Sequence, residues 1–146
     1  MVTFIWIALS CTGPEPRDTP PPEREGSAEQ EGLLKQRFAD GSLPAKERMD
    51  AGADLLVLDG GPAFVASLYG GEDRVLVRGV LDSAEARSPA QAARLGAQLM
   101  AVAKGEEKLA FESLLLERGS DAVVPLVELL EEGTDWQTAV QALDAL

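Results

Sequence analysis

Histidine is absent from the chain, and cysteine, tyrosine and tryptophan are rare, at one, one and two residues among 146. Without histidine there is no imidazole metal ligand, no imidazole proton shuttle and no histidine-based catalytic triad. A single cysteine excludes an internal disulfide framework, and no cysteine cluster or EF-hand loop is present. These absences remove the commonest catalytic and metal-binding groups, so we expect neither catalysis nor a cofactor.

Positive charge is also scarce. Lysine and arginine number 13 against 25 aspartates and glutamates, which gives a net charge of −12. Six acids and two bases fall within residues 11–31, so residues 32–146 carry −8 of that total. A surface this acidic repels phosphate backbones, and no basic patch or aromatic platform is present, so nucleic-acid binding is not expected.

Long apolar runs are missing as well, and the longest one near the N-terminus spans only residues 2–9. A transmembrane helix needs about 20 apolar residues, so we do not expect one here. The run is followed by Ser10 and by the single cysteine, Cys11. A short apolar segment, a small residue and then cysteine resembles the signal of bacterial lipoproteins.

This resemblance implies that residues 1–10 are a signal segment and that Cys11 carries lipid. The chain departs from the family pattern in two ways. Ala8 and Leu9 stand in the reverse of the preferred order, and no basic residue precedes Arg17, although export signals have a basic head. A start codon further upstream would explain the second departure. Thr12, rather than aspartate, resembles the outer-membrane sorting pattern. A secreted protein, or a buried N-terminal strand with an inert cysteine, are the alternatives.

Residues 13–31 contain five prolines and no large apolar side chain. Such a segment cannot bury enough surface to offset its own ordering entropy, so we expect it to be disordered. Proline favours extended polyproline II geometry of about 3.1 Å per residue, which would hold a domain on the order of 50 Å from a membrane. We therefore divide the chain into a signal segment, an acylated linker over 11–31 and a domain over 32–146.

Beyond residue 28 the apolar residues recur at helical spacing. Ser88 to Gln91 and Thr134 to Gln137 each form a capping box, and Gly105, Gly119 and Gly133 stand where helices should stop. The sequence therefore predicts an all-α domain with eight helices over 28–39, 44–58, 62–69, 73–84, 89–103, 106–118, 121–132 and 135–146.

The last two predicted helices resemble a HEAT repeat: a leucine-rich first helix with an early proline, Pro125, is followed by Asp135 and a second helix rich in alanine and leucine. Residues 62–78 form a fainter copy that ends in the Val77-Arg78 pair typical of the family. The resemblance implies four stacked αα-hairpins in a solenoid that binds another protein. Second helices would line the concave side, with Arg74, Arg78, Gln137 and Gln141 as candidate contacts.

The chain's last residues, 142–146, contain no glycine stop and no polar capping helix. An uncapped solenoid end exposes an apolar edge, here with Leu143 and Leu146, and we expect it to dock onto a partner or a second copy of the chain. The predicted function is that of a membrane-tethered, periplasm-facing interaction module or scaffold of the bacterial envelope.

A competing interpretation is a small soluble α/β domain that binds a ligand or acts as an enzyme. Residues 54–58 and 74–77 would be its strands, and Asp59-Gly60-Gly61 would form a glycine-turn site. This turn lacks the Lys-Ser/Thr of a phosphate loop and the full dinucleotide fingerprint. The proportion of strand therefore separates the two interpretations.

Overall fold

The computed structural model describes residues 25–133 and 136–146, which form eight helices and no strand within those ranges. The predicted all-α class is confirmed. The helices are α1 (Glu25–Ala39), α2 (Ala45–Leu55), α3 (Gly61–Ser67), α4 (Arg74–Arg87), α5 (Pro89–Val102), α6 (Glu106–Arg118), α7 (Ser120–Glu131) and α8 (Trp136–Ala145).

The α/β alternative is wrong because both of its proposed strands are helical or turn segments. Residues 54–58 contain the end of α2 and a following turn, and residues 74–77 open α4. The predicted signal segment 1–10, Cys11 and the linker as far as residue 24 lie outside the described residues. The helix α1 begins at Glu25, so the last residues assigned to the linker are helical.

Helix ends follow the punctuation that the sequence contains. Ser88 is extended, as expected for a residue before proline, and its hydroxyl accepts a hydrogen bond from the Gln91 N–H at 3.5 Å. The Ser88 N–H donates to the Ala84 carbonyl at 2.8 Å and not to the Gln91 side chain, so the structure shows the N-cap half of the predicted capping box. Gly105, Gly119 and Gly133 all have positive φ, which other residues adopt at a cost. The second predicted capping box includes residues 134 and 135, outside the described ranges.

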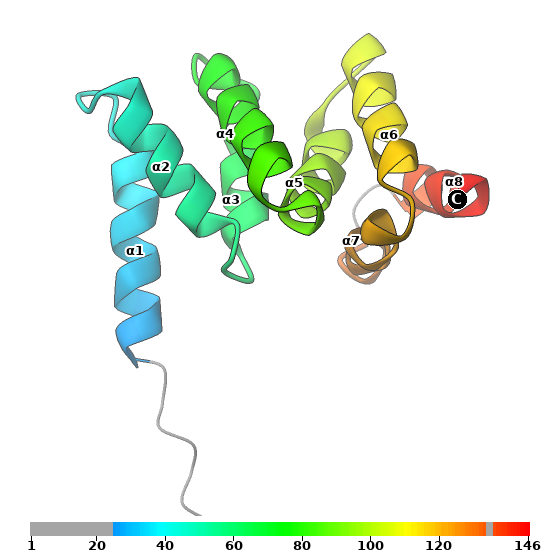
Figure 1. Cartoon of the computed structure of the whole chain (residues 1–146), viewed down its shortest axis with the longest axis horizontal. Coiled ribbons are helices and arrows are strands. Elements are labelled where there is room, and N and C mark those ends of the chain that lie inside the picture. Colours follow the sequence, from blue (N-terminus) through cyan, green and yellow to red (C-terminus); the bar gives the residue numbers. More distant parts are fainter. Residues whose placement is uncertain (1–24, 134–135) are drawn as a thin grey trace, which may run out of the picture.

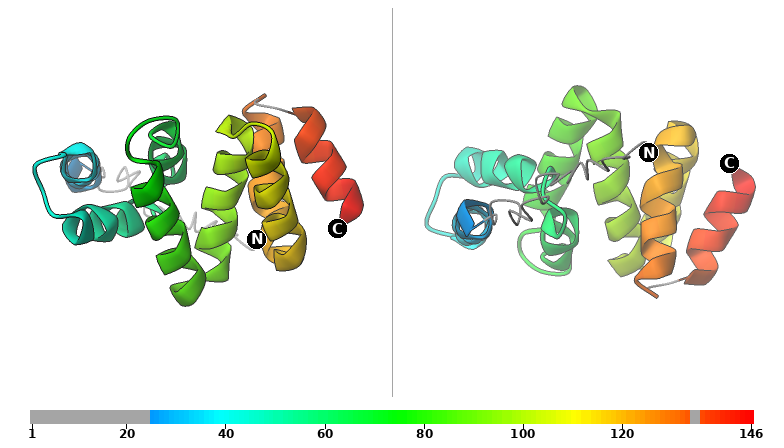
Figure 2. Two further views of the ribbon diagram at one scale, coloured as in Figure 1. Left: turned by 90° about the horizontal axis from the view of Figure 1, so that it is seen from above. Right: turned by 90° about the horizontal axis from the view of Figure 1, so that it is seen from below.

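From α1 at one end to α8 at the other, the helices lie broadly in chain order along the longest axis of the molecule, with α3 and α4, and likewise α6 and α7, overlapping along that axis (Figure 1). The same order is seen from above and below (Figure 2). At the centre, α5 packs against α3, α4, α6 and α7, and seven of its residues are buried. Four of these seven are alanine or glycine, whose small size lets several helices approach one axis, as at Gly96 against Leu114.

Three of the four predicted helix pairs pack directly: α1 on α2, α5 on α6 and α7 on α8. The short helix α3 instead makes its closest backbone contacts with α5 and α2 rather than with α4. The pair α3–α4 therefore departs from a regular hairpin. With only seven residues, α3 has about two turns, too few to present a long packing face to α4.

Two pairs of alternate helices, α4 with α6 and α5 with α7, run parallel with contacts in a fixed register. Between α4 and α6 the paired side chains are 33 positions apart: Arg74 with Glu107, Arg78 with Phe111, and Glu85 with Arg118. Between α5 and α7 they are 34 positions apart: Arg94 with Glu128, and Gln98 with Glu132. Because each set advances in the same direction along both helices, the partners lie side by side and parallel.

Arg48 joins three helices near the α1 end of the row. Its side chain is only 11% exposed; Nε donates to the Phe38 carbonyl at 2.8 Å and Nη2 donates to the Asp73 carboxylate at 2.7 Å. It thereby satisfies a carbonyl at the end of α1, where helices leave acceptors unpaired, and holds the start of α4. Asp73 makes no side-chain cap bond to α4, because its carboxylate is used by Arg48.

Candidate protein-interaction surfaces

Arg74 and Arg78, two of the predicted contact residues, lie one turn apart on α4, and both side chains are half exposed. Arg74 forms an ion pair with Glu107 of α6, and Arg78 Nη2 lies 3.7 Å from the same carboxylate oxygen. The Tyr69 hydroxyl donates to that oxygen at 3.0 Å. The structure thus brings the two arginines together, in a network within the chain.

Two aromatic rings pack against the arginines of this network. The guanidinium of Arg74 lies 5.3 Å from the Tyr69 ring centre, and that of Arg78 lies 5.5 Å from the Phe111 ring centre. The two rings meet edge to face at 5.6 Å. Burial raises the pKa of Tyr69, but hydrogen bonds and positive charge from Arg78 and Arg74 lower it by more, so that it falls below its ordinary value.

We call these five residues, Tyr69, Arg74, Arg78, Glu107 and Phe111, the α4–α6 cluster. A cavity of about 380 Å³ opens beside it, with Lys104 on its wall. Glu107 is the one carboxylate that both arginines contact, so its charge is used within the chain in joining α4 to α6.

The other predicted contact residues lie on α8, at the far end of the row from α1 (Figure 1). Gln137 and Gln141 are one turn apart and exposed. Leu143 is partly buried against the core, and Leu146 is 44% exposed. Val140, which was not among the predicted contacts, is 45% exposed. Leu146 directly follows α8, and the other residues lie on this helix, which packs on α7 and α6; all of them are separate from the α4–α6 cluster.

The Asp59-Gly60-Gly61 turn has a structural explanation. A Cβ at Gly61 would collide with the carbonyl oxygen of Leu55, so the chain can fold back from α2 into α3 only if residue 61 lacks a side chain. The turn is closed by two backbone hydrogen bonds, from Leu58 N–H to Leu55 at 3.0 Å and from Gly61 N–H to Leu58 at 3.1 Å. Gly61 is therefore explained by a close backbone approach.

Asp59 contributes to a different feature, a groove of about 520 Å³ between the turn, α5 and α7. A second cavity of about 350 Å³ adjoins it and shares three of its residues. We call the two together the α5–α7 groove. Its walls come from the turn, the first half of α5 and the whole length of α7, chiefly Asp59, Ala90, Arg94, Asp121, Val124 and Glu128.

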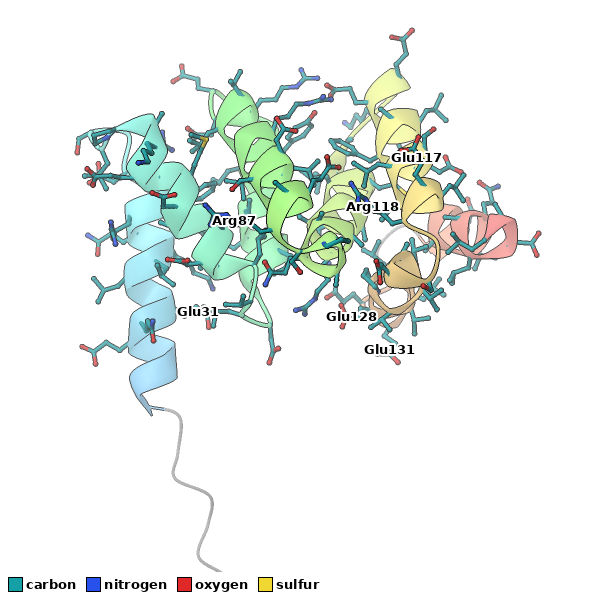
Figure 3. The ribbon with its side chains drawn as sticks, in the orientation of Figure 1. Glu31, Arg87, Glu117, Arg118, Glu128 and Glu131 are labelled. Carbon is teal, nitrogen blue, oxygen red and sulfur yellow. The ribbon has the colours of Figure 1, made fainter. Side chains whose placement is uncertain are left out.

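The groove is lined chiefly by acidic side chains, and its apolar lining comes from Ala90, Val124 and Pro125. Five carboxylates line the two cavities, with a single guanidinium from Arg94, whose Nε lies 3.6 Å from Glu128. Val124 is 63% exposed and sits over the buried Pro125. Glu128 and Glu131 project from α7 on the lower side of the view in Figure 3, whereas Glu117 lies above them on α6.

Sequence reasoning identified Asp59 for another reason and missed the rest of the groove. The signal available was the face of α7 itself, where residues 121, 124, 128 and 131 recur at helical spacing and include three acids and one valine. Nothing in the sequence alone places that face beside Arg94 and Asp59.

Neither a metal centre nor a membrane helix is found in the part of the chain that the structure describes. No three carboxylate, cysteine or histidine side chains there come close enough to share a metal ion. None of the helices in residues 25–133 and 136–146 combines the length and the apolar character that crossing a bilayer requires. Cys11, the predicted lipid attachment site, lies outside these ranges.

Comparison of the chain with protein-family models, with curated proteins and with solved structures finds no match.

Proposed function

We propose that this chain is a protein-binding module built as a HEAT-like stack of helix pairs, tethered to a membrane of the bacterial envelope through lipid on Cys11. The proposal assigns it no catalysis. Its function would be to present a surface at a distance from the membrane, as a scaffold does. Three separate features support the proposal: the packing register, the groove, and the N-terminal sequence.

The observation that carries the proposal is the parallel register. Contacts between α4 and α6 and between α5 and α7 repeat at 33 and 34 residues, close to the length of one helix pair. Stacked repeats produce this spacing, because each pair packs on the next in the same orientation and contacts chiefly its neighbours. The early proline in α7 and the alanine-rich α8 agree with the resemblance of residues 121–146 to a HEAT repeat.

Stacked helix pairs of this kind commonly bind another protein along a face formed by successive helices. Here the α5–α7 groove offers such a face, with Val124 exposed between charged walls. The exposed side of α8, with Gln137, Gln141 and Val140, offers a second. Leu143 and Leu146 stay candidates for contact with a partner or a second copy at that edge.

The tether rests on the sequence alone. The apolar segment before Cys11 and the proline-rich segment after it favour an acylated chain held away from the membrane, and Thr12 favours the outer membrane of a Gram-negative cell. Mass spectrometry of the protein from membranes of its native host tests this. We expect a chain that begins at Cys11 with added acyl mass, and a Cys11→Ser variant without that mass. An unmodified chain starting at Met1 in the cytosol would contradict the tether.

The scaffold role has its own test. Native electrophoresis of a mild-detergent extract of the same membranes should show the chain in a complex much larger than its 15.5 kDa. A deletion of residues 12–24 is the matched control, since it shortens the spacer and leaves all eight helices in place. Migration of the native chain as a monomer at its natural abundance would contradict a scaffold.

A further inference from the structure

We propose that the α5–α7 groove binds an extended, positively charged segment of a partner protein. This inference rests on the proposed function, which it deepens by naming the chemistry of the partner. It depends on the size of the groove, on its uncompensated negative charge and on the exposed apolar side chain of Val124 between the carboxylates.

The groove has the length of a short peptide. Its residues on α7 run from Ser120 to Glu132 and so span about 18 Å at 1.5 Å per residue. An extended chain advances about 3.3 Å per residue, so some five residues would fit end to end. Because side chains of an extended segment alternate, apolar side chains on one side of the segment could contact Val124 while the others meet the carboxylates.

The charge of the groove is not neutralised within the chain. Of its five carboxylates, Glu128 lies near Arg94, and Glu132 accepts a hydrogen bond from Gln98 at 3.2 Å. The other three, Asp59, Asp121 and Glu131, have no ion-pair partner among the described residues. Lysine or arginine side chains at alternate positions of a bound segment would meet these carboxylates and provide the missing countercharge.

Pro125 also changes the main-chain hydrogen bonding of α7. Pro125 lies within α7 and has no N–H, so the carbonyl of Asp121 lacks the donor that residue 125 of a regular helix would supply. Ser120, Asp121 and Pro125 all line the groove. A cationic side chain is a strong hydrogen-bond donor and has no acceptor of its own, so it suits a site lined by carboxylates.

A second copy of the chain is a poor occupant. The chain carries a net charge of −12, so two copies repel each other, and no two of its 13 basic residues are adjacent in the sequence. Phosphate and acidic peptides are repelled by the same rim. The complementary ligand is a basic segment with small apolar residues between its charges.

Fluorescence anisotropy with the full chain in mild detergent tests this. The probe is a fluorescein-labelled pentapeptide that alternates lysine and valine, and its control replaces each lysine by glutamate. We expect the lysine peptide alone to bind, and to bind more weakly as salt is raised to about 0.15 M. Equal binding of both peptides, or no binding of either, would overturn the inference.

A pair of variants locates the binding. The double variant Asp121→Asn/Glu131→Gln removes two unpaired groove charges and should weaken binding of the lysine peptide about fivefold. The control is Glu117→Gln combined with Glu112→Gln, which removes two charges from α6 instead. An equal loss in the control would show attraction by net charge alone and would contradict a groove site.

The outcome can be separated from that of the proposed function. If neither peptide binds while the chain runs as a large complex in membrane extracts, the partner chemistry is wrong and the scaffold role is kept. If the lysine peptide binds in the groove while the native chain runs as a monomer, the groove chemistry is supported and the scaffold role is wrong.

Discussion

The α4–α6 cluster and the α5–α7 groove are built alike and use their charges differently. Each joins two parallel helices about one repeat apart. In the cluster, Glu107 contacts two arginines and a tyrosine, so its negative charge helps to hold α4 against α6. In the groove, Asp59, Asp121 and Glu131 have no partner within the described residues. A charged residue that the sequence suggests as a binding contact can therefore be judged only when its ion-pair partners within the chain are known.

The largest effect is expected at the turn that places Asp59 in the α5–α7 groove. Gly61→Ala places a Cβ against the Leu55 carbonyl, a backbone group that cannot move aside, and should cost about 3 kcal/mol of unfolding free energy. Urea denaturation of the full chain measures this. Gly60→Ala is the control, because its Cβ would meet only Glu31 Oε1 at 3.6 Å and its φ is −86°, so its change should stay within about 0.5 kcal/mol. Equal losses would mean that the turn can rearrange.

The next largest effect is expected at Arg48, whose side chain is held by contacts within the chain, in comparison with the exposed Arg87. Arg48→Met leaves the Phe38 carbonyl and the Asp73 carboxylate without their donor, and should cost about 2 to 3 kcal/mol. Thermal unfolding of this variant is compared with that of Arg87→Met, which alters an exposed side chain at the end of α4. A loss at position 87 as large as that at position 48 would rule out a special role for the Arg48 contacts.

One carboxylate from each region can be neutralised and the two effects on stability compared: Glu107 from the α4–α6 cluster and Glu128 from the α5–α7 groove. Glu107→Gln weakens an ion pair with half-exposed partners and should cost about 1 kcal/mol, discounted for solvent screening. Glu128→Gln has only the longer contact to Arg94, and its effect should remain within about 0.5 kcal/mol. Chemical denaturation gives both values. The reverse order would show that the groove, and not the cluster, carries the structural charge.

The smallest effect concerns Tyr69, which is the only tyrosine in the chain. Its ionisation, followed by ultraviolet absorbance, should have a midpoint below the ordinary pKa of 10.0, and Arg78→Ala should raise that midpoint. Because the folded pKa lies below the unfolded one, folding gains stability as pH rises between the two values and gains none at neutral pH. A midpoint above 10.0 would mean that the hydrogen bond to Glu107 dominates.

The helices could be predicted because their signals are local. Apolar spacing and residues such as Ser88, Pro89 and Gly119 act within a few positions, and the eight predicted helices match those in the structure. The end of α2 was predicted three residues too late, since residues 56–58 leave the helix to make the close approach to Gly61. That constraint is tertiary and has no local signature.

The candidate site could be predicted only in part. Arg74 and Arg78 were found as a pair, but their partner Glu107 is 33 positions from Arg74, and the sequence does not show that the three meet. The groove needs three separate segments, around Asp59, Arg94 and Asp121. No pattern within any one of them reveals that their faces converge.

The most direct test compares the two surfaces in the native host. A photo-crosslinking amino acid, p-benzoylphenylalanine, is placed at position 131 in the α5–α7 groove or at position 104 beside the α4–α6 cluster. Both positions are exposed, so each variant should fold. We predict an adduct of one defined mass from position 131 and none from position 104. Adducts from position 104 alone, or none from either position, would contradict the account.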